Sequence, residues 1–540
     1  MTDRKPEESN RVSDGSPEAR SRARRAAAES KSIELEVKYS IEDARAVARW
    51  LDETYPPEPD HPWRTHSITD RYFDTPDRAL FAAGYGARLR RTDRRTILTV
   101  KSDIEVTGAL HRRIELEAPA TASLEVGDWP ESDGRSRLVE IIGDRPLLER
   151  FTVQVKRRDR FISIGGGVLL ASVDEGSVEW SGVDAGPIAQ FEVEYVRGRR
   201  AALVRMARAI DKASIARPES RSKLAIAEGM SAEAARVRAD DLFSDAGRKV
   251  MRRHLLRLLD REIGTRAGDQ LALKQMRVAT RRLRATWRVF DDGFRKSVRR
   301  SHSDELSVLG RELGQVRDLD VLIASIRDDP ALAALADNWW LEREAGFARA
   351  IGVLDSKRYA RFVADSLELT QTPGKGATKR AARLTVAGTA PSALRDGYAR
   401  LLEAASSAET SADPTAWHAL RIEGRRLRYS LEAFADVLGA AATAELIARV
   451  TRMQDHLGAM NDAAVAIEAV TTWLADPDLH FDDGTRGAAQ EFVARREANI
   501  ADLRTTVGAV WAQVSDEAVA TLLDQALAPL SPTVEALTQS

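Results

Sequence analysis

The segment Ser32-Ile33-Glu34-Leu35-Glu36-Val37-Lys38-Tyr39 alternates between apolar and charged residues from Ile33 onward. Successive side chains of a β-strand point to opposite faces, so this period of two predicts a strand. One face carries only apolar residues and should pack on a core. The other face carries Glu34, Glu36 and Lys38, which must therefore point either at water or at something bound.

The same alternation recurs in several later segments between residues 85 and 195. Its charged members are Arg88, Arg90, Lys101, Arg113, Glu115, Glu117, Lys156, Arg158, Asp174, Glu192 and Glu194. For a single strand, the solvent-exposed face of an ordinary antiparallel sheet explains such a pattern, with opposite charges paired across strands. Exposed strand faces also use Thr, Ser and Gln freely, whereas this set is almost purely Glu, Asp, Arg and Lys.

If the sheet closes into a barrel, these charged faces line its bore. Burying ions is costly unless partners or metals satisfy them, so the pattern favours a bore that binds divalent cations and a polyanion. Carboxylate oxygens suit Mg²⁺ or Mn²⁺, and Arg and Lys suit phosphate oxygens.

The order of these motifs resembles that of the CYTH family of triphosphate tunnel metalloenzymes over about Ser32 to Glu228. The motifs are Glu-x-Glu-x-Lys at 34–38, Tyr-Phe-Asp-Thr at 72–75, Arg-x-Arg at 88–90, Thr-x-Lys at 99–101, Arg-x-Glu-x-Glu at 113–117, Lys-x-Arg at 156–158, Asp-Glu-Gly at 174–176, Glu-x-Glu at 192–194 and Ser222-Lys223. The resemblance implies an eight-stranded antiparallel β-barrel that forms a tunnel. Members of the family hydrolyse triphosphates or cyclise ATP with a divalent metal. One departure is Leu224, where many relatives carry Tyr.

The resemblance also implies roles for the charged residues. The carboxylates expected to bind metal or orient water are Glu34, Glu36, Glu115, Glu117, Asp174, Glu192 and Glu194. The cations expected to hold the phosphate chain are Lys38, Arg88, Arg90, Lys101, Arg113, Lys156, Arg158 and Lys223. Among these, Glu34, Glu36, Lys38, Glu115 and Glu117 are expected to be catalytic.

From Ala232 onward the apolar period changes from two to 3.6, which predicts an all-helical second half and a boundary near 229–235. This half repeats itself. Residues 274–284 align with 418–428, and residues 313–321 align with 457–465 at the same offset of 144 residues. Two matches at one offset predict a duplicated helical bundle.

Each repeat places basic residues at helical spacings of three and four, on one face. These residues are Lys274, Arg277, Arg281 and Arg284 in the first repeat and His418, Arg421, Arg425 and Arg428 in the second. A solvated basic face is the simpler explanation for one such stripe. Like charges repel at these spacings, however, so building the stripe twice favours a bound anion, and arginine favours bidentate contacts with phosphate.

The second half resembles a CHAD domain, a helical module of two repeats that often follows CYTH. The resemblance covers about Asp240 to Leu530, with repeats near 240–370 and 380–530, and implies binding of inorganic polyphosphate. Relatives usually carry His where this chain has Lys274.

The composition of the chain indicates the number of domains and the location of the protein. A chain of 540 residues with 43% hydrophobic residues should hold at least two domains, which we expect at 32–230 and 240–530 after a disordered tail at 1–31. With no cysteine, the chain has no disulfide, thiolate metal site or cysteine nucleophile. The apolar stretches are too short for a membrane helix or a signal peptide, so we expect a cytoplasmic protein.

The sequence therefore predicts a metal-dependent inorganic triphosphatase whose helical half captures polyphosphate, with no membrane or specific nucleic acid as partner. Three alternatives stay open: an adenylyl cyclase, a thiamine or nucleoside triphosphatase of the same superfamily, and a non-catalytic polyphosphate-binding protein.

Overall fold

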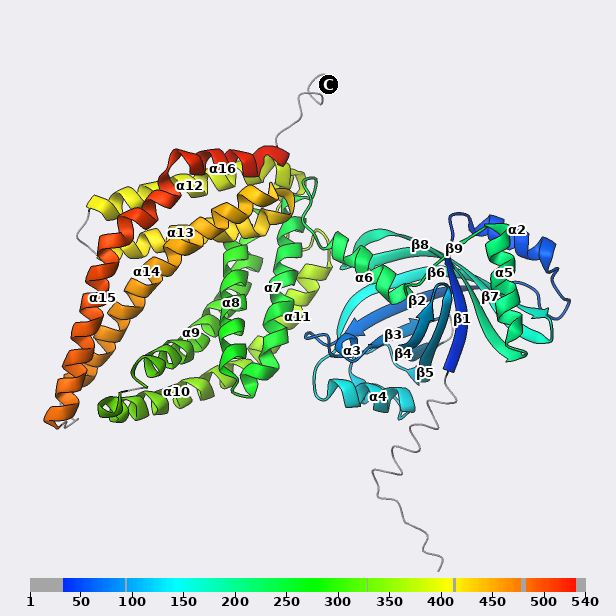
Figure 1. The fold of residues 1–540 in the computed structure, drawn as a ribbon, viewed down its shortest axis with the longest axis horizontal. Coiled ribbons are helices and arrows are strands. Elements are labelled where there is room, and N and C mark those ends of the chain that lie inside the picture. The colour runs from blue at the N-terminus through cyan, green and yellow to red at the C-terminus, as the bar shows by residue number, and fades with distance from the viewer. Residues whose placement is uncertain (1–32, 93–94, 328, 411–413, 477–481, 531–540) are drawn as a thin grey trace, which may run out of the picture. The chain divides into compact units, whose positions relative to one another are not determined.

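The computed structural model describes residues 33–92, 95–327, 329–410, 414–476 and 482–530 (Figure 1). The tail predicted at 1–31 lies outside these ranges. The chain divides into two units, one ending at Glu233 and the other beginning at Ala234. The first unit is rich in strands and the second is helical.

The first unit is a closed antiparallel barrel, as predicted. Its eight strands are β1 (Ile33–Ser40), β2 (Arg64–Asp74), β3 (Tyr85–Arg91), β4 (Thr96–Thr107), β5 (Leu110–Ala120), β6 (Leu148–Ile164), β7 (Gly167–Trp180) and β8 (Val183–Gly198). They pair in the order β5-β4-β3-β2-β6-β7-β8-β1, and pairing of β1 with β5 closes the ring. A short strand, β9 (Arg217–Pro218), pairs with the end of β1.

The outer face of the barrel carries apolar side chains that helices cover. Helices α2 (Ala44–Thr54) and α5 (Ala201–Ala213) pack on the outer faces of β1, β7 and β8 (Figure 1). Helices α3 (Ala79–Ala82) and α4 (Asp133–Ile142) cover β3, β4 and β5. The apolar face predicted for the first strand lies here, with Val37 and Tyr39 buried, although Ile33 is 40% exposed. The charged face of the same strand therefore points into the barrel.

Part of the barrel interior is apolar. Val153 and Val155 of β6 pack there with Ile68, Tyr72, Phe151, Val178 and Ile188. Helix α6 (Lys223–Ala234) packs Leu224 and Ala227 against this cluster. Leu224 packs closely over Gly86, where a Cβ would lie 2.3 Å from its Cδ2 atom, so a larger residue at position 86 would displace the leucine side chain. The apolar cluster thus fixes α6 and positions Lys223 at its first turn.

The second unit is a duplicated helical bundle, as predicted. Its first repeat contains α7 (Phe243–Arg266), α8 (Gln270–Val289), α9 (Lys296–Ile326), α10 (Ala333–Leu354) and α11 (Lys357–Gln371). Its second repeat contains α12 (Val386–Thr410), α13 (Pro414–Phe434), α14 (Ala440–Leu474), α15 (Asp483–Ser515) and α16 (Glu517–Leu527). The starts of α8 and α13, and those of α9 and α14, are each separated by the 144 residues found in the sequence. Helices α8 and α13 pack against each other and join the two repeats.

Among the described helices, none has both the length and the apolar character needed to cross a bilayer. The cytoplasmic location stays a prediction.

Candidate active site in the barrel

A cavity of about 580 Å³ lies inside the barrel, between the charged inner faces of its strands. Its charged lining consists of Glu34, Glu36, Lys38, Arg88, Arg90, Lys101, Arg113, Glu115, Glu117, Arg157, Glu192, Glu194, Lys223 and Glu228. The structure therefore brings together twelve of the fifteen tunnel residues named from the sequence. The other three are Asp174, Lys156 and Arg158.

One side of the cavity gathers carboxylates. Lys101 Nζ lies 2.9 Å from both Glu34 Oε2 and Glu115 Oε1. Burial opposes ionisation of Glu34, but Lys101 and Lys38 outweigh it and lower the pKa of this carboxyl to about 2. Burial, together with Glu34, Glu115 and Glu36, raises the pKa of Glu194 to about 7. Four carboxylates, those of Glu34, Glu36, Glu115 and Glu194, therefore lie within electrostatic reach of one another.

Such a cluster fits a hard divalent cation, which prefers carboxylate oxygens and relieves their mutual repulsion. Within the described ranges, no three acidic or histidine side chains are already arranged as a metal site. The ammonium group of Lys101 lies between Glu34 and Glu115. The fit therefore rests on the donor types and on the carboxylates gathered around Glu194.

The raised pKa of Glu194 predicts that the stability of the metal-free protein depends on pH. The folded barrel keeps the carboxyl protonated up to pH about 7, whereas the unfolded chain releases the proton near the usual value of 4.5. This contribution to stability is fully present below the unfolded pKa and is lost as pH rises through the folded one. In EDTA, we expect the stability of the protein relative to Glu194→Gln to fall by up to about 3 kcal/mol between pH 4.5 and pH 8. Thermal melts across that range test it, and parallel curves for the two proteins would contradict it.

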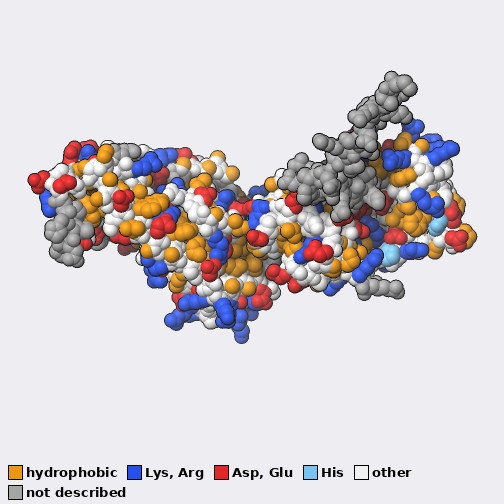
Figure 2. All heavy atoms as spheres, turned by 90° about the horizontal axis from the view of Figure 1, so that it is seen from below, with side chains coloured by type: hydrophobic (Ala, Val, Ile, Leu, Met, Phe, Trp, Pro, Cys, Tyr) orange, Lys and Arg blue, Asp and Glu red, His pale blue; other side chains and the backbone are white. Residues whose placement is uncertain are grey.

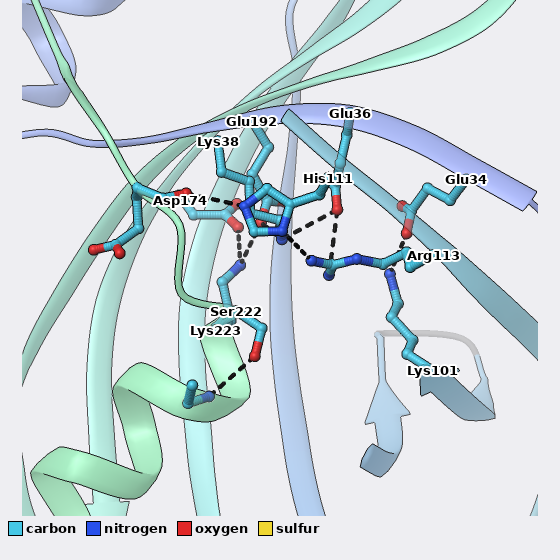
Figure 3. A network of polar contacts seen from close by, with 12 residues as sticks. Glu34, Glu36, Lys38, Lys101, His111, Arg113, Asp174, Glu192, Ser222 and Lys223 are labelled. Carbon is cyan, nitrogen blue, oxygen red and sulfur yellow. Dashed lines mark hydrogen bonds and ion pairs between the residues drawn. The ribbon is translucent and has the colours of Figure 1, made fainter. Parts of the chain in front are cut away.

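The opposite side of the cavity gathers cations around two buried carboxylates. Lys38 Nζ lies 2.8 Å from Glu192 Oε1, and Lys223 Nζ lies 2.5 Å from Asp174 Oδ2 (Figure 3). Arg157 donates to both carboxylates, at 2.7 Å and 2.8 Å. Burial disfavours the charge on Asp174, but Arg157 and Lys223 lower its pKa to about 2. Asp174 is 1% exposed and does not line the cavity, so it acts as a counterion that holds Arg157 and Lys223 in place.

A third buried carboxylate, Asp70, was missed in the sequence. Arg90 donates to its two oxygens at 2.8 Å and 2.9 Å, and Arg88 lies 3.1 Å away. Burial opposes ionisation, but Arg88 and Arg90 hold the pKa of Asp70 well below its usual range. Asp70 precedes Tyr72 by two residues, so the two side chains share one face of β2. This spacing is the sequence signal that could have identified Asp70. It fixes two cations that the sequence did identify.

The prediction that Lys156 and Arg158 line the bore is wrong. Lys156 is exposed, and the guanidinium of Arg158 lies 4.9 Å from the ring centroid of Trp63. Arg157 points into the cavity in their place. The reason is that Val153 and Val155 belong to the apolar part of the interior, so the inward-facing residues of β6 are the odd-numbered ones.

The Tyr-Phe-Asp-Thr segment positions an aromatic residue at the cavity. The Asp74 carboxylate accepts hydrogen bonds from the backbone N–H groups of Thr75, Leu80 and Phe81 and so holds α3 at the end of β2. Phe81 and Tyr85 both line the cavity. Neither ring was named among the site residues in the sequence.

The basic residues predicted on the helical unit also come together. Helix α8 supplies Arg277 and Arg281, and α13 supplies Arg421 and Arg425. Burial, Arg281 and Arg421 lower the pKa of Arg425 to about 10, and burial also lowers the pKa of Arg277. We call these four residues the arginine cluster. Their mutual repulsion shows that the two stripes face a common region.

The remaining stripe residues lie around the arginine cluster. Lys274 and His418 are exposed, while Arg284 and Arg428 are partly buried. Two aspartates that the sequence did not place at this site also lie here. Asp318 lies 3.2 Å from Arg277. Burial and the nearby charge of Asp462 raise the pKa of Asp318. These two aspartates are equivalent positions of the repeat. Over most of the face drawn in Figure 2, acidic and basic side chains are interspersed, and Lys and Arg side chains gather at its lower edge.

Comparisons with known proteins agree with this division. The family model of the CYTH domain matches residues 32–226, and that of the CHAD domain matches residues 249–471. Proteins described as uncharacterized from two strains of Mycobacterium tuberculosis are 27% identical over 442 residues, which covers 75% of this chain and 82% of theirs.

Solved structures resemble each half separately. The CHAD domain from the plant Ricinus communis is 25% identical and covers 52% of this chain and 93% of its own, with a TM-score of 0.44. PptA from Streptomyces chartreusis is 19% identical and covers 50% of this chain and 98% of its own, with a TM-score of 0.40. A Hippeastrum protein, described as a candidate adenylyl cyclase with a dominant triphosphatase activity, is 17% identical and covers 36% of this chain and 95% of its own, with a TM-score of 0.28. The family matches carry the assignment: the chain contains a CYTH domain at residues 32–226 and, C-terminal to it, a CHAD domain at residues 249–471.

Proposed function

We propose that the barrel hydrolyses inorganic triphosphate with the help of Mg²⁺ or Mn²⁺. The observation that carries this proposal is the division of one cavity inside the barrel into a side rich in carboxylates and a side rich in lysine and arginine. Enzymes of the CYTH superfamily generally depend on a divalent metal, and the acidic cluster supplies the donors that such an ion prefers.

The carboxylates that would hold the cation are Glu34, Glu36, Glu115 and Glu117. A bound dication would neutralise charge on the phosphate oxygens and make a nearby water more acidic. Glu194, which lines the cavity beside these carboxylates, would orient the attacking water and accept its proton.

The cations on the other side would hold the phosphate chain. Phosphoryl transfer depends mainly on positioning and on stabilising charge that is spread over the phosphate oxygens. Asp70, Asp174 and Glu192 already hold the arginine and lysine side chains inside the cavity. The structure therefore offers the substrate a set of cations that need little reorganisation.

We propose that the helical unit binds inorganic polyphosphate at the arginine cluster. Burial lowers the pKa of Arg425, and repulsion by Arg281 across the α8–α13 contact and by Arg421 lowers it further. A polyanion would remove this repulsion, and each guanidinium can form two parallel hydrogen bonds with phosphate.

One observation favours a nucleoside or thiamine triphosphate as an alternative substrate. Phe81 and Tyr85 line the cavity, and aromatic rings can stack on a nucleobase or a thiazole. One face of Phe81 is taken, since the guanidinium of Arg78 lies 4.0 Å from its ring centroid. An adenylyl cyclase would use the same two rings to bind the adenine of ATP.

Phe81→Ala separates these substrates. If inorganic triphosphate is the substrate, we expect the kcat/KM for triphosphate to change less than about twofold, because it has no group to stack on the ring. For ATP or thiamine triphosphate, a stacking role predicts a loss of about two- to tenfold, from the 0.5 to 1.5 kcal/mol that aromatic pairs contribute beyond their buried area. A large loss with inorganic triphosphate would contradict the proposal.

A phosphate-release assay on a panel of substrates tests the proposed reaction. Inorganic triphosphate, ATP, thiamine triphosphate and pyrophosphate would be compared at equal concentrations with Mg²⁺ and with Mn²⁺, and cyclic AMP would be measured in the ATP sample. We expect the highest kcat/KM for inorganic triphosphate. Preferential turnover of ATP or thiamine triphosphate, or formation of cyclic AMP, would select an alternative, and absence of phosphate release from every substrate would leave a binding protein.

A further inference from the structure

A buried histidine in the barrel, His111, has no role in the reaction described above. It lies on β5, on the same face as Arg113 and Glu115, and its side chain is completely buried at 0% exposure. Burial lowers its pKa, so the imidazole is neutral near pH 7. One ring nitrogen therefore carries a hydrogen and the other can only accept.

The two ring nitrogens contact different parts of the site (Figure 3). Nδ1 lies 2.7 Å from Arg113 Nη2. Because a guanidinium can only donate, Nδ1 must be the acceptor in this pair. Nε2 lies 2.9 Å from the backbone oxygen of Glu219, which can only accept, so Nε2 carries the hydrogen. The contacts thus select one tautomer and satisfy both nitrogens.

Each partner of His111 leads to a cavity residue. Arg113 lines the cavity, and its Nη1 atom lies 3.3 Å from Glu36 Oε1. Glu219 belongs to the segment that pairs with β1, where its N–H donates to the Lys38 carbonyl at 3.0 Å. Four residues later this segment reaches Lys223, whose ammonium group holds Asp174. His111 therefore connects the guanidinium of Arg113 with the segment that carries Lys223.

We infer that His111 is a positioning residue that holds the guanidinium of Arg113 in the orientation that receives a phosphate oxygen. The inference rests on the proposed function, because it requires the cavity to bind a triphosphate. Arg113 is 3% exposed, and a long side chain that loses a partner can adopt other rotamers. The acceptor at Nδ1 restricts this freedom without adding a negative charge that would compete with the substrate.

Asparagine and glutamine at position 111 separate the two contacts of the ring. The Oδ1 atom of asparagine can take the place of Nδ1 as an acceptor for Arg113, but no donor reaches Glu219. The Nε2 atom of glutamine can take the place of the ring Nε2 and donate to Glu219, but the acceptor for Arg113 is displaced. The two variants thus each keep one hydrogen bond of the wild-type ring. His302→Gln is a matched control, since His302 is a buried histidine of the helical unit that also makes one hydrogen bond to a backbone oxygen, that of Val298.

The test measures triphosphate in two ways on the full-length protein. Calorimetric titration in EDTA gives the affinity without turnover, and steady-state assays with Mg²⁺ give KM and kcat. We expect His111→Gln to weaken binding and raise KM by about tenfold, since a hydrogen bond to a charged group is lost, whereas His111→Asn stays within about threefold of the wild type. His302→Gln should leave both values unchanged.

The outcomes separate this inference from the proposed function. Equal affinities for the Gln and Asn variants, or weaker binding by Asn than by Gln, would overturn the positioning role while wild-type turnover stands. Loss of the native circular dichroism spectrum in both variants would make His111 a structural residue and would also overturn it. A wild-type protein that neither binds nor hydrolyses triphosphate would instead overturn the proposed function, and the inference with it.

Discussion

Changing Glu34 or Glu36 to glutamine is expected to lower triphosphate turnover by about 100-fold or more while the barrel stays folded. A neutral amide is a poorer ligand for a hard dication than a carboxylate. Stabilisation of transition-state charge by a bound metal amounts to several kcal/mol, and each 1.4 kcal/mol is a factor of ten in rate. Steady-state phosphate release at saturating Mg²⁺ measures the effect.

The fold should tolerate these substitutions because each affected cation keeps another partner. Lys101 keeps Glu115 when Glu34 is changed, and when Glu36 is changed Lys38 keeps Glu192 and Arg113 keeps His111. Glu175→Gln is the matched control, since this glutamate lies on the exposed face of β7. Near-normal activity of both Glu34→Gln and Glu36→Gln would contradict the proposal that these two carboxylates bind the metal.

Changing Arg421, Arg425 and Arg428 together to glutamine is expected to weaken binding of long-chain polyphosphate by about tenfold or more at low salt. A hydrogen bond to a charged group is worth about 1.5–3 kcal/mol, so the loss of even one phosphate contact predicts this change. Each contact also releases counterions, so the slope of log affinity against log salt should become shallower by about 2 for three lost contacts. Titrations of the full-length protein at several salt concentrations measure both quantities.

The control for this variant removes the same charge from elsewhere on the helical unit. Arg300, Arg395 and Arg495 lie on α9, α12 and α15 and are all largely exposed. Their triple change to glutamine should alter the affinity and the salt slope much less. Both triple variants should keep the wild-type turnover of triphosphate. Equal losses of polyphosphate affinity in the two variants would show that net charge, not the arginine cluster, governs binding.

The sequence was sufficient to predict the barrel, the duplication and most of the cavity lining, because strand and helix periodicity translate directly into faces. Alternation in β1 and β5 predicts which side chains point inward as soon as the sheet is assumed to close. The 144-residue offset likewise recurs in the helix bounds of both repeats.

The alternation assigned the wrong inward-facing residues in the part of the barrel interior that is apolar. On β6, Val153 and Val155 pack inside the barrel against α6, so the usual assumption that apolar residues face outward to the covering helices assigns the wrong face. This is why Lys156 and Arg158 were named instead of Arg157. A strand whose two faces both contact apolar groups gives no local signal of which one points inward.

The missed residues Asp70 and His111 share a different cause. Each contacts a partner that is distant in sequence, and tertiary pairing brings them together. Arg90 reaches Asp70 across the β2–β3 ladder, and Glu219 reaches His111 from the segment before α6. Single residues of these types are common in strands, so only the pairing identifies them.

The most direct test of the account is phosphate release from inorganic triphosphate by the full-length protein, with Mg²⁺ or Mn²⁺ and then with excess EDTA. The cavity chemistry predicts turnover with the metal, loss of turnover on chelation, and recovery when the metal is returned in excess. Turnover that persists unchanged in EDTA, or no phosphate release with either metal, would contradict the claim that the acidic cluster of the barrel is the centre of a metal-dependent triphosphatase.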